Sequence, residues 1–250
     1  MTLLSVNVNK IALVRNSRNI GIPSVTRAAE ICVDAGAGGI TVHPRPDQRH
    51  IRPSDVFELA EMLRVEFNIE GNPFAGPSRD YPGFMEIVRK ARPAQCTLVP
   101  DAPGQLTSDH GWDLSQGAER LAPIVDELKG LGIRISLFMD PDCRQIRRAA
   151  DCRVDRVELY TEPYARAFEK GSPDASLEQY ALAARTAQEA GLGVNAGHDL
   201  NLKNLGPFCT IPGILEVSIG HALISEALEM GLSETVKAYL KILSSCTRAE

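Results

Sequence analysis

The segment VDAGAGGITVH, residues 33–43, decides the fold of this chain, because it joins the end of a helical pattern to a buried strand through glycine. The same order recurs in LKGLGIRISLF, residues 128–138, and in QEAGLGVNAGH, residues 188–198. Glycine at such a junction supplies the left-handed conformation that ends a helix. Repeated units of helix, glycine and strand predict parallel strands joined by helices.

Eight β-rich runs can be placed along the chain, at residues 3–8, 39–43, 66–70, 96–99, 133–139, 156–160, 192–195 and 215–219. Helical patterns separate or follow them at residues 24–35, 54–65, 82–90, 115–129, 142–150, 176–190, 222–231 and 234–246. Eight strands close a parallel barrel, and 250 residues suit one such barrel. We therefore predict an α/β fold, a single-domain (β/α)8 TIM barrel over residues 1–250 with extra short helices. Ser24, Ser54 and Asp142 are the predicted N-caps, and residues 71–82, 100–112 and 162–173 are predicted loops and candidate lids.

The bulk composition narrows the class of function. The net charge is −5 and no block of basic residues stands out, which argues against a nucleic-acid surface. The six cysteines form no C-x-x-C pair and are expected to be reduced thiols. No signal peptide or membrane span is predicted, so we expect a cytoplasmic protein.

Polar or ionisable side chains stand at nearly every predicted strand end. His43 and Glu70 end the second and third runs, His198 follows the seventh, and Glu158 lies in the sixth. The carboxyl ends of barrel strands converge on one mouth, where the chemistry of this fold takes place. Clustered histidines and carboxylates there predict acid–base catalysis, with Glu158 either in a direct role or orienting a neighbour.

Glycines after the last two strands point to phosphate. Gly197 and Gly220 lie where the backbone N–H groups of this fold usually hold an anion. A second possible anion site lies in the connections that follow the first and second strands, which contain Arg15, Arg18, Arg45 and Arg49. Each of these arginines can equally be an ordinary surface residue. Two anionic groups on the substrates are therefore predicted.

The chain resembles the pyridoxine 5′-phosphate synthase family along its whole length. The resemblance is carried by VNVNKIALVRNSR, GGITVHPRPDQRHI, FNIEG, LVPD, ISLFMD, VELYT, VNAGHDLNLKNL and EVSIGHALI, in that order. It implies a (β/α)8 barrel, assembled as a homo-octamer. It also implies the condensation of 1-deoxy-D-xylulose 5-phosphate with 3-amino-2-oxopropyl phosphate, without a cofactor or a metal. These two phosphorylated small molecules are the expected partners, and no nucleic acid or membrane is expected.

The resemblance also assigns roles to residues by matching motifs. His43 and Glu70 match proton acceptors, His198 a proton donor, and Glu158 a carboxylate that stabilises the transition state. The matching substrate contacts are Asn7, Arg18, Gly220 and His221 for the aminoketone phosphate, and Arg45, His50 and Thr107 for the deoxyxylulose phosphate.

The sequence departs from the family pattern in three places. Asp199 replaces a glycine that contacts the aminoketone phosphate, so its carboxylate must point away or weaken that contact. Asn9 and Lys10 replace an Asp-His pair that helps to hold the deoxyxylulose phosphate, and Lys10 can act there as a point charge. The segment GNPFAGPSRDYPG, residues 71–83, also differs, which bears on lid behaviour.

Two other classes of protein compete with the synthase. A metal-dependent sugar isomerase or aldolase barrel would use ligands such as Glu70, Asp140, Glu158, His198 and His221. Lys10 adds a Schiff-base variant of the aldolase. A non-catalytic phosphosugar-binding barrel would need the anion sites without the acid–base residues.

Overall fold

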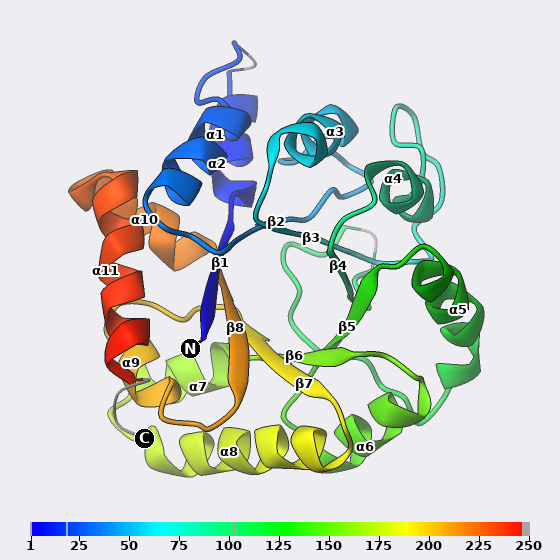
Figure 1. The fold of residues 1–250 in the computed structure, drawn as a ribbon, viewed down its shortest axis with the longest axis vertical. Coiled ribbons are helices and arrows are strands. Elements are labelled where there is room, and N and C mark those ends of the chain that lie inside the picture. The colour runs from blue at the N-terminus through cyan, green and yellow to red at the C-terminus, as the bar shows by residue number, and fades with distance from the viewer. Residues whose placement is uncertain (1, 19, 103, 247–250) are drawn as a thin grey trace.

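A computed structural model describes residues 2–18, 20–102 and 104–246 and confirms the predicted barrel. Its eight strands are parallel and close on themselves in sequence order, with β8 pairing β1 (Figure 1). The strands are β1 (Leu3–Asn7), β2 (Gly39–Val42), β3 (Glu66–Gly71), β4 (Gln95–Leu98), β5 (Arg134–Met139), β6 (Arg156–Tyr160), β7 (Gly193–Gly197) and β8 (Ile214–Ile219). Each lies within two residues of its predicted bounds.

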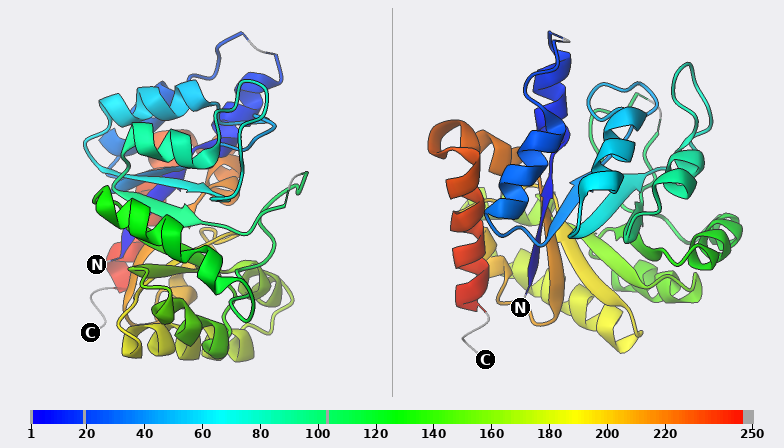
Figure 2. Two further views of the ribbon diagram at one scale, coloured as in Figure 1. Left: turned by 90° about the vertical axis from the view of Figure 1, so that its right-hand side faces the viewer. Right: turned by 45° about the horizontal axis from the view of Figure 1, so that its top comes forward.

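Helices surround the barrel on its outer face (Figures 1 and 2). They are α1 (Asn9–Asn16), α2 (Val25–Asp34), α3 (Pro53–Met62), α4 (Phe84–Ala91), the 3-10 helix η1 (Ala118–Arg120), α5 (Ala122–Gly130), α6 (Cys143–Asp151), α7 (Glu162–Glu169), α8 (Asp174–Glu189), α9 (Leu205–Phe208), α10 (His221–Met230) and α11 (Leu232–Cys246). None of the helices in the described ranges is long and apolar enough to cross a membrane.

Some local predictions were wrong. Residues 162–173 were expected to be a loop, but α7 begins there with Pro163 in its first turn, where proline is well tolerated. The helix expected at 115–129 is divided into η1 and α5, since Gly117 adopts φ +77° and Pro123 opens α5. Helix α1, which was not placed from the sequence, lacks a clear apolar stripe and buries Ala12 and Arg15.

N-terminal caps and glycine junctions explain where several other helices begin and end. Ser24 and Asp142 cap α2 and α6 as predicted, each accepting backbone N–H bonds. Ser54 is not a cap, because α3 begins at Pro53 and the side chain of Asp55 accepts the N–H of Arg52 at 2.8 Å. Glycines that precede strands adopt the left-handed conformation expected of them, with φ +107° at Gly36, +74° at Gly132 and +79° at Gly191.

The two faces of the barrel wall differ in polarity. Strand residues such as Ile40, Leu137 and Val157 are fully buried in the core cluster that the helices complete. The alternate residues are polar and bond to one another across neighbouring strands. Ser5 Oγ lies 2.7 Å from Thr41 Oγ1, and Thr97 Oγ1 donates to Asn68 Oδ1 at 3.1 Å; all four residues are buried. Parallel strands are usually apolar on both faces, so this sequence reserves the barrel interior for polar groups.

Candidate active site

The carboxyl ends of β2 and β3 bring His43 and Glu70 together. His43 follows β2 directly and Glu70 is the penultimate residue of β3. The distance from His43 Nδ1 to Glu70 Oε2 is 3.9 Å, and both side chains are buried. The His50 ring lies 6.4 Å from the His43 ring, centre to centre. The convergence that the sequence predicted for these residues is therefore present in the fold.

Two asparagines from the β1 end hold this pair in place. Asn9 Oδ1 accepts the backbone N–H of His43 at 2.9 Å, and Asn7 Oδ1 accepts the backbone N–H of Asn9 at 3.0 Å. Asn7 Nδ2 also donates to Glu70 Oε2 at 3.4 Å. Asn7 and Asn9 thus connect the first strand to the second and third.

Burial drives the pKa values of the pair in opposite directions. The pKa of His43 is lowered well below 6.5, by burial first and then by the positive charge of Arg45. The pKa of Glu70 is raised well above 4.5, by burial and then by the nearby carboxyl of Glu158. Burial therefore favours the uncharged form of each group, a neutral imidazole beside a protonated carboxyl, and this pairing suits proton transfer in either direction.

His198 occupies an aromatic setting on the far side of the mouth. It has φ +84°, a conformation unusual for a side chain of this size, and its ring lies 5.3 Å from the rings of both Phe138 and Tyr160. Thr161 Oγ1 donates to the carbonyl of Gly197 at 2.6 Å and so fixes the turn. Burial, followed by Arg45 and Lys10, lowers the pKa of His198 to about 4.

Glu158 lies inside the barrel below this mouth. Its side chain is buried, and Oε2 accepts from Thr97 Oγ1 at 3.4 Å. Burial raises its pKa to about 7. A Cβ on Gly197 would come within 2.4 Å of Glu158 Oε1, so the absence of a side chain at Gly197 makes room for this carboxyl.

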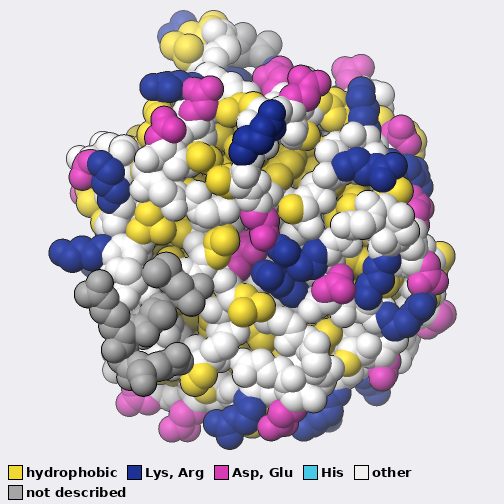
Figure 3. All heavy atoms as spheres, in the orientation of Figure 1, with side chains coloured by type: hydrophobic (Ala, Val, Ile, Leu, Met, Phe, Trp, Pro, Cys, Tyr) yellow, Lys and Arg dark blue, Asp and Glu magenta, His cyan; other side chains and the backbone are white. Residues whose placement is uncertain are grey.

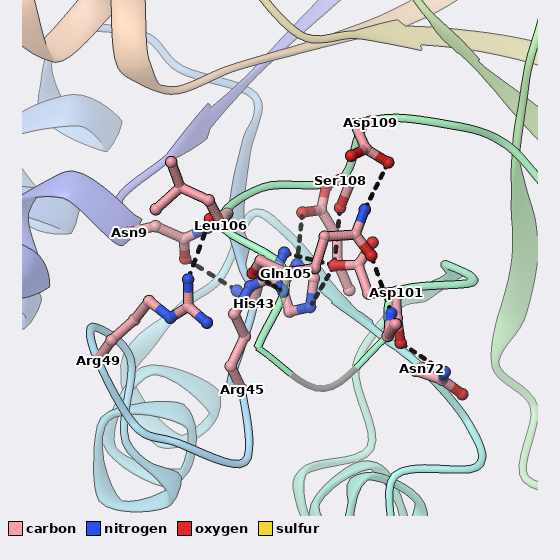
Figure 4. A network of polar contacts seen from close by, with 12 residues as sticks. Asn9, His43, Arg45, Arg49, Asn72, Asp101, Gln105, Leu106, Ser108 and Asp109 are labelled. Atoms are coloured by element: carbon pink, nitrogen blue, oxygen red, sulfur yellow. Dashed lines mark hydrogen bonds and ion pairs between the residues drawn. The ribbon is translucent and has the colours of Figure 1, made fainter.

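Two arginines from the β2–α3 connection lie at the mouth and contact the segment that follows β4 (Figure 4). Arg45 forms an ion pair with Asp101 and donates to the carbonyl of Gln105 at 3.3 Å. Arg49 pairs with Asp47 and donates to the carbonyl of Leu106 at 3.1 Å. These contacts attach the predicted lid of residues 100–112 to the cationic side of the site. Figure 2 shows this segment extending from the barrel.

Asp101 is the residue whose importance the sequence did not reveal. In the structure it is 6% exposed and contacts Arg45, Ser108 and His43. The signal in the sequence that could have identified it is its position, a carboxylate directly after the fourth strand and Pro100.

The remaining predicted substrate contacts are more open. Arg18, Thr107, Asp199 and His221 are exposed, and Lys10 and Gly220 are half-buried. Gly220 passes close to Asn7: a Cβ there would be 3.0 Å from Asn7 Cβ. Although Asp199 is exposed, the protein around its carboxyl removes part of its hydration, and this loss together with the charge of Glu162 raises its pKa.

Two polar residues belong elsewhere. Arg15, a candidate cation for the mouth, instead pairs with Asp55 and donates to the carbonyl of His50 at 3.2 Å, which joins α1 to α3. His110 is exposed and contacts Asp109 at 2.6 Å, outside the buried cluster.

The ligand set of the metal alternative is not assembled. Within residues 2–18, 20–102 and 104–246, no group of three or more His, Cys, Asp or Glu side chains is arranged to hold a metal ion. On the face shown in Figure 3, basic side chains are interspersed with acidic ones and form no continuous basic patch.

Comparison with known proteins gives a consistent picture. The family model described as pyridoxal phosphate biosynthesis protein PdxJ matches residues 4–245. A pyridoxine 5′-phosphate synthase of Xanthomonas axonopodis pv. citri is 58% identical over 248 residues, covering 98% of this chain and 97% of the relative. One from Xylella fastidiosa (strain M23) is 57% identical over 252 residues, covering 99% and 97%.

Solved structures resemble the chain in fold alone. Orotidine 5′-monophosphate decarboxylase from Methanocaldococcus jannaschii is 11% identical, with a TM-score of 0.63 and coverage of 97% of this chain and 99% of that one. Phosphoribosylanthranilate isomerase from Thermotoga maritima is 12% identical, with a TM-score of 0.59 and coverage of 98% and 100%.

Proposed function

Because this chain belongs to the family of pyridoxal phosphate biosynthesis protein PdxJ and is a pyridoxine 5′-phosphate synthase, we propose that His43, Glu70 and His198 carry the protons of its reaction. The enzyme condenses 1-deoxy-D-xylulose 5-phosphate with 3-amino-2-oxopropyl phosphate. The products are pyridoxine 5′-phosphate, inorganic phosphate and water.

One observation carries the proposal: a buried histidine and a buried carboxyl face each other with pKa values displaced in opposite directions. The condensation begins when the amine of one substrate attacks the ketone of the other to form an imine. Imine formation releases water; proton removal next to the imine, loss of phosphate, addition of water, ring closure and final dehydration follow. Most of these steps move a proton near neutral pH, which calls for several tuned acids and bases.

Neutral His43 is the base of the pair, since its lowered pKa leaves a ring nitrogen free to accept a proton. Burial raises the pKa of Glu70 and so favours its protonated form, which can return a proton and then act as a base once it has given that proton up. A base and an acid within 3.9 Å of each other allow removal and return of protons without solvent.

His198 is the donor for dehydration, although burial and the cations Arg45 and Lys10 keep it neutral. Binding of the substrate phosphates reverses this effect, because two anions offset those cations and favour the imidazolium. Substrate binding therefore charges the acid that the dehydration needs. Glu158, whose pKa is about 7, supports the cationic intermediates from below.

The phosphate contacts are proposed from position and charge. Arg45, His50 and Thr107 serve the deoxyxylulose phosphate, together with Asn9 and Lys10. Asn7, Arg18, Gly220 and His221 serve the aminoketone phosphate, with Asp199 at its edge. The close approach of Gly220 to Asn7 supports their sharing one ligand.

The decisive experiment measures pyridoxine 5′-phosphate and released phosphate from the two substrates. His43→Asn and Glu70→Gln should each reduce turnover by at least roughly a hundredfold. His110→Asn is the matched control, because it replaces an exposed histidine of the lid and should leave turnover unchanged. Near-normal turnover in both His43→Asn and Glu70→Gln would refute the assignment.

We also propose that the chain works as a cytoplasmic homo-octamer. Exposed apolar side chains on α1 and the segment after it support association, namely Leu13, Val14, Ile20 and Ile22. The described cysteines are all free thiols, which suits a reducing compartment. Light scattering tests the octamer: a monomer at micromolar concentration would contradict it.

A further inference from the structure

We propose that Asp101 is a positioning residue that fixes the tautomer of His43. This inference deepens the proposed function and depends on it, since it concerns the base of that reaction. The geometry is a histidine held between two carboxyl groups. His43 Nδ1 faces Glu70 Oε2 at 3.9 Å, and His43 Nε2 faces Asp101 Oδ2 at 3.7 Å. A neutral imidazole carries one N–H, so its proton points either from Nδ1 at Glu70 or from Nε2 at Asp101.

The two carboxyl groups differ in charge. Asp101 Oδ2 forms an ion pair with the guanidinium of Arg45 and accepts Ser108 Oγ at 2.9 Å, so its negative charge is balanced in place. Glu70 has no arginine partner among the described contacts, and its pKa is raised by burial and by Glu158. An N–H group bonds more strongly to an anion than to a neutral carboxyl. The ring proton therefore belongs on Nε2, directed at Asp101.

The orientation of Asp101 supports a role beyond anchoring the lid. Asp55, a structural carboxylate in the same chain, uses both oxygens: Arg15 binds both, and Arg52 N–H adds a bond at 2.8 Å. In Asp101 a single oxygen, Oδ2, makes the contacts with Arg45, Ser108 and His43. Its other oxygen, Oδ1, is buried without a hydrogen-bond partner among the described residues. A carboxylate that served only to tie a loop would gain by bonding both oxygens.

Within the described part of the chain, the carboxylate that lies against His43 Nε2 is that of Asp101. The charged and titratable groups that act on it, besides Glu70 and Asp101, are Arg45, Arg49, His50 and His198. The arginines are donors only and cannot accept the ring N–H. The backbone N–H of His43 is already bonded to Asn9 Oδ1. Asp101 is therefore the group that decides which nitrogen carries the proton.

The consequence is chemical. With its proton on Nε2, His43 keeps the lone pair of Nδ1 on the Glu70 side, where it accepts a proton from substrate. The resulting imidazolium retains Nε2–H against Asp101 Oδ2, which stays paired with Arg45. Asp101 thus has the role of the aspartate in a Ser-His-Asp triad, which orients the histidine and stabilises its charged form.

The test measures the tautomer directly, without substrate. Protein labelled with 15N-histidine carries five labelled residues, and His43→Asn identifies the signal of His43. Nitrogen shifts should show Nε2–H in the wild type. In Asp101→Ala the carboxylate that faces Nε2 is lost while the positive charges of Arg45 and Arg49 still act on the ring, so the proton should move to Nδ1, towards Glu70. The value of kcat should fall at least roughly a hundredfold, with KM changed less than about threefold. Asp109→Ala, an exposed aspartate in the same segment, should change neither.

Asp101→Asn covers the case in which the alanine variant fails to fold. It keeps an oxygen acceptor but removes the charge, so a mixture of tautomers and a smaller loss of kcat are expected. Nδ1–H in the wild type, or Nε2–H retained in full by both variants, overturns the inference. So does a kcat within threefold of wild type for the folded Asp101 variants. Failure of the proposed function is seen separately, as a wild-type protein that makes no pyridoxine 5′-phosphate or as an active His43→Asn variant.

Discussion

Replacing Glu158 by glutamine should stabilise the protein at alkaline pH and leave it almost unchanged at acid pH. Glu158 is 2% exposed, and burial raises its pKa from 4.5 to about 7. Between these two values the unfolded chain releases the proton while the folded chain keeps it. The folded state is therefore penalised progressively as pH rises from 4.5, and fully above 7. Glutamine imitates the protonated carboxyl and can still accept from Thr97.

The size of the effect follows from the pKa values. At 1.36 kcal/mol for each tenfold change in the protonation constant, a rise from 4.5 to about 7 corresponds to about 3 kcal/mol at pH 8. For a chain of 250 residues, that free energy corresponds to a rise in Tm of roughly 6–12 °C. At pH 4.5 the difference between the variant and the wild type should be below about 1 kcal/mol.

Thermal and urea unfolding at pH 4.5 and pH 8 measure this difference for both proteins. Glu61→Gln, an exposed glutamate on α3, is the matched control and should show the same stability as wild type at both pH values. An equal difference between Glu158→Gln and wild type at the two pH values would show that Glu158 is not held protonated. A variant less stable than wild type at pH 8 would refute the reasoning altogether.

Three further outcomes are expected. Gly197→Ala places a Cβ 2.4 Å from Glu158 Oε1 and should reduce turnover at least roughly tenfold. The control Gly206→Ala, whose Cβ would meet nothing closer than 3.8 Å, should leave turnover unchanged. Equal turnover in the two variants would contradict the close packing of Gly197 against Glu158. Wild-type stability should fall as pH drops from 6.5 towards 4, because the unfolded chain protonates His198 at 6.5 and the folded chain only at about 4; the acid limb of an unfolding series should flatten in His198→Asn. Asp199→Gly removes a carboxylate at the edge of the proposed aminoketone phosphate site, so KM for the aminoketone phosphate should fall. It also removes a side chain from a residue with φ +58°, so Tm should be unchanged or higher. A higher KM would show that Asp199 takes part in binding.

The order of the elements was largely predictable because its signals are local. The left-handed glycines at Gly36, Gly132 and Gly191 mark helix ends through the conformation they adopt, and no distant contact is needed to place them. The errors were local in origin too. Proline opens α7 where a loop was expected, and the positive φ of Gly117 interrupts the helix expected at 115–129.

The convergence of His43 and Glu70 was predictable since closing a parallel barrel brings strand ends to one mouth. The choice of partners was not. Arg15 and Arg45 are both arginines that follow early strands, yet one fastens α1 to α3 through Asp55 and the other faces the site beside Asp101. Which of them is catalytically relevant depends on helix packing that leaves no mark in the sequence.

The sequence by itself therefore determined the barrel, its strand ends and the kinds of group gathered there, because each follows from short-range patterns and one closure rule. Tertiary structure alone decided that Asp101 meets Arg45, 56 residues away, and that Asp101 faces His43. It also decided the burial that makes the pKa of His43 fall and the pKa of Glu70 rise. Removal from water depends on what the rest of the chain places around a side chain, and no local pattern specifies that.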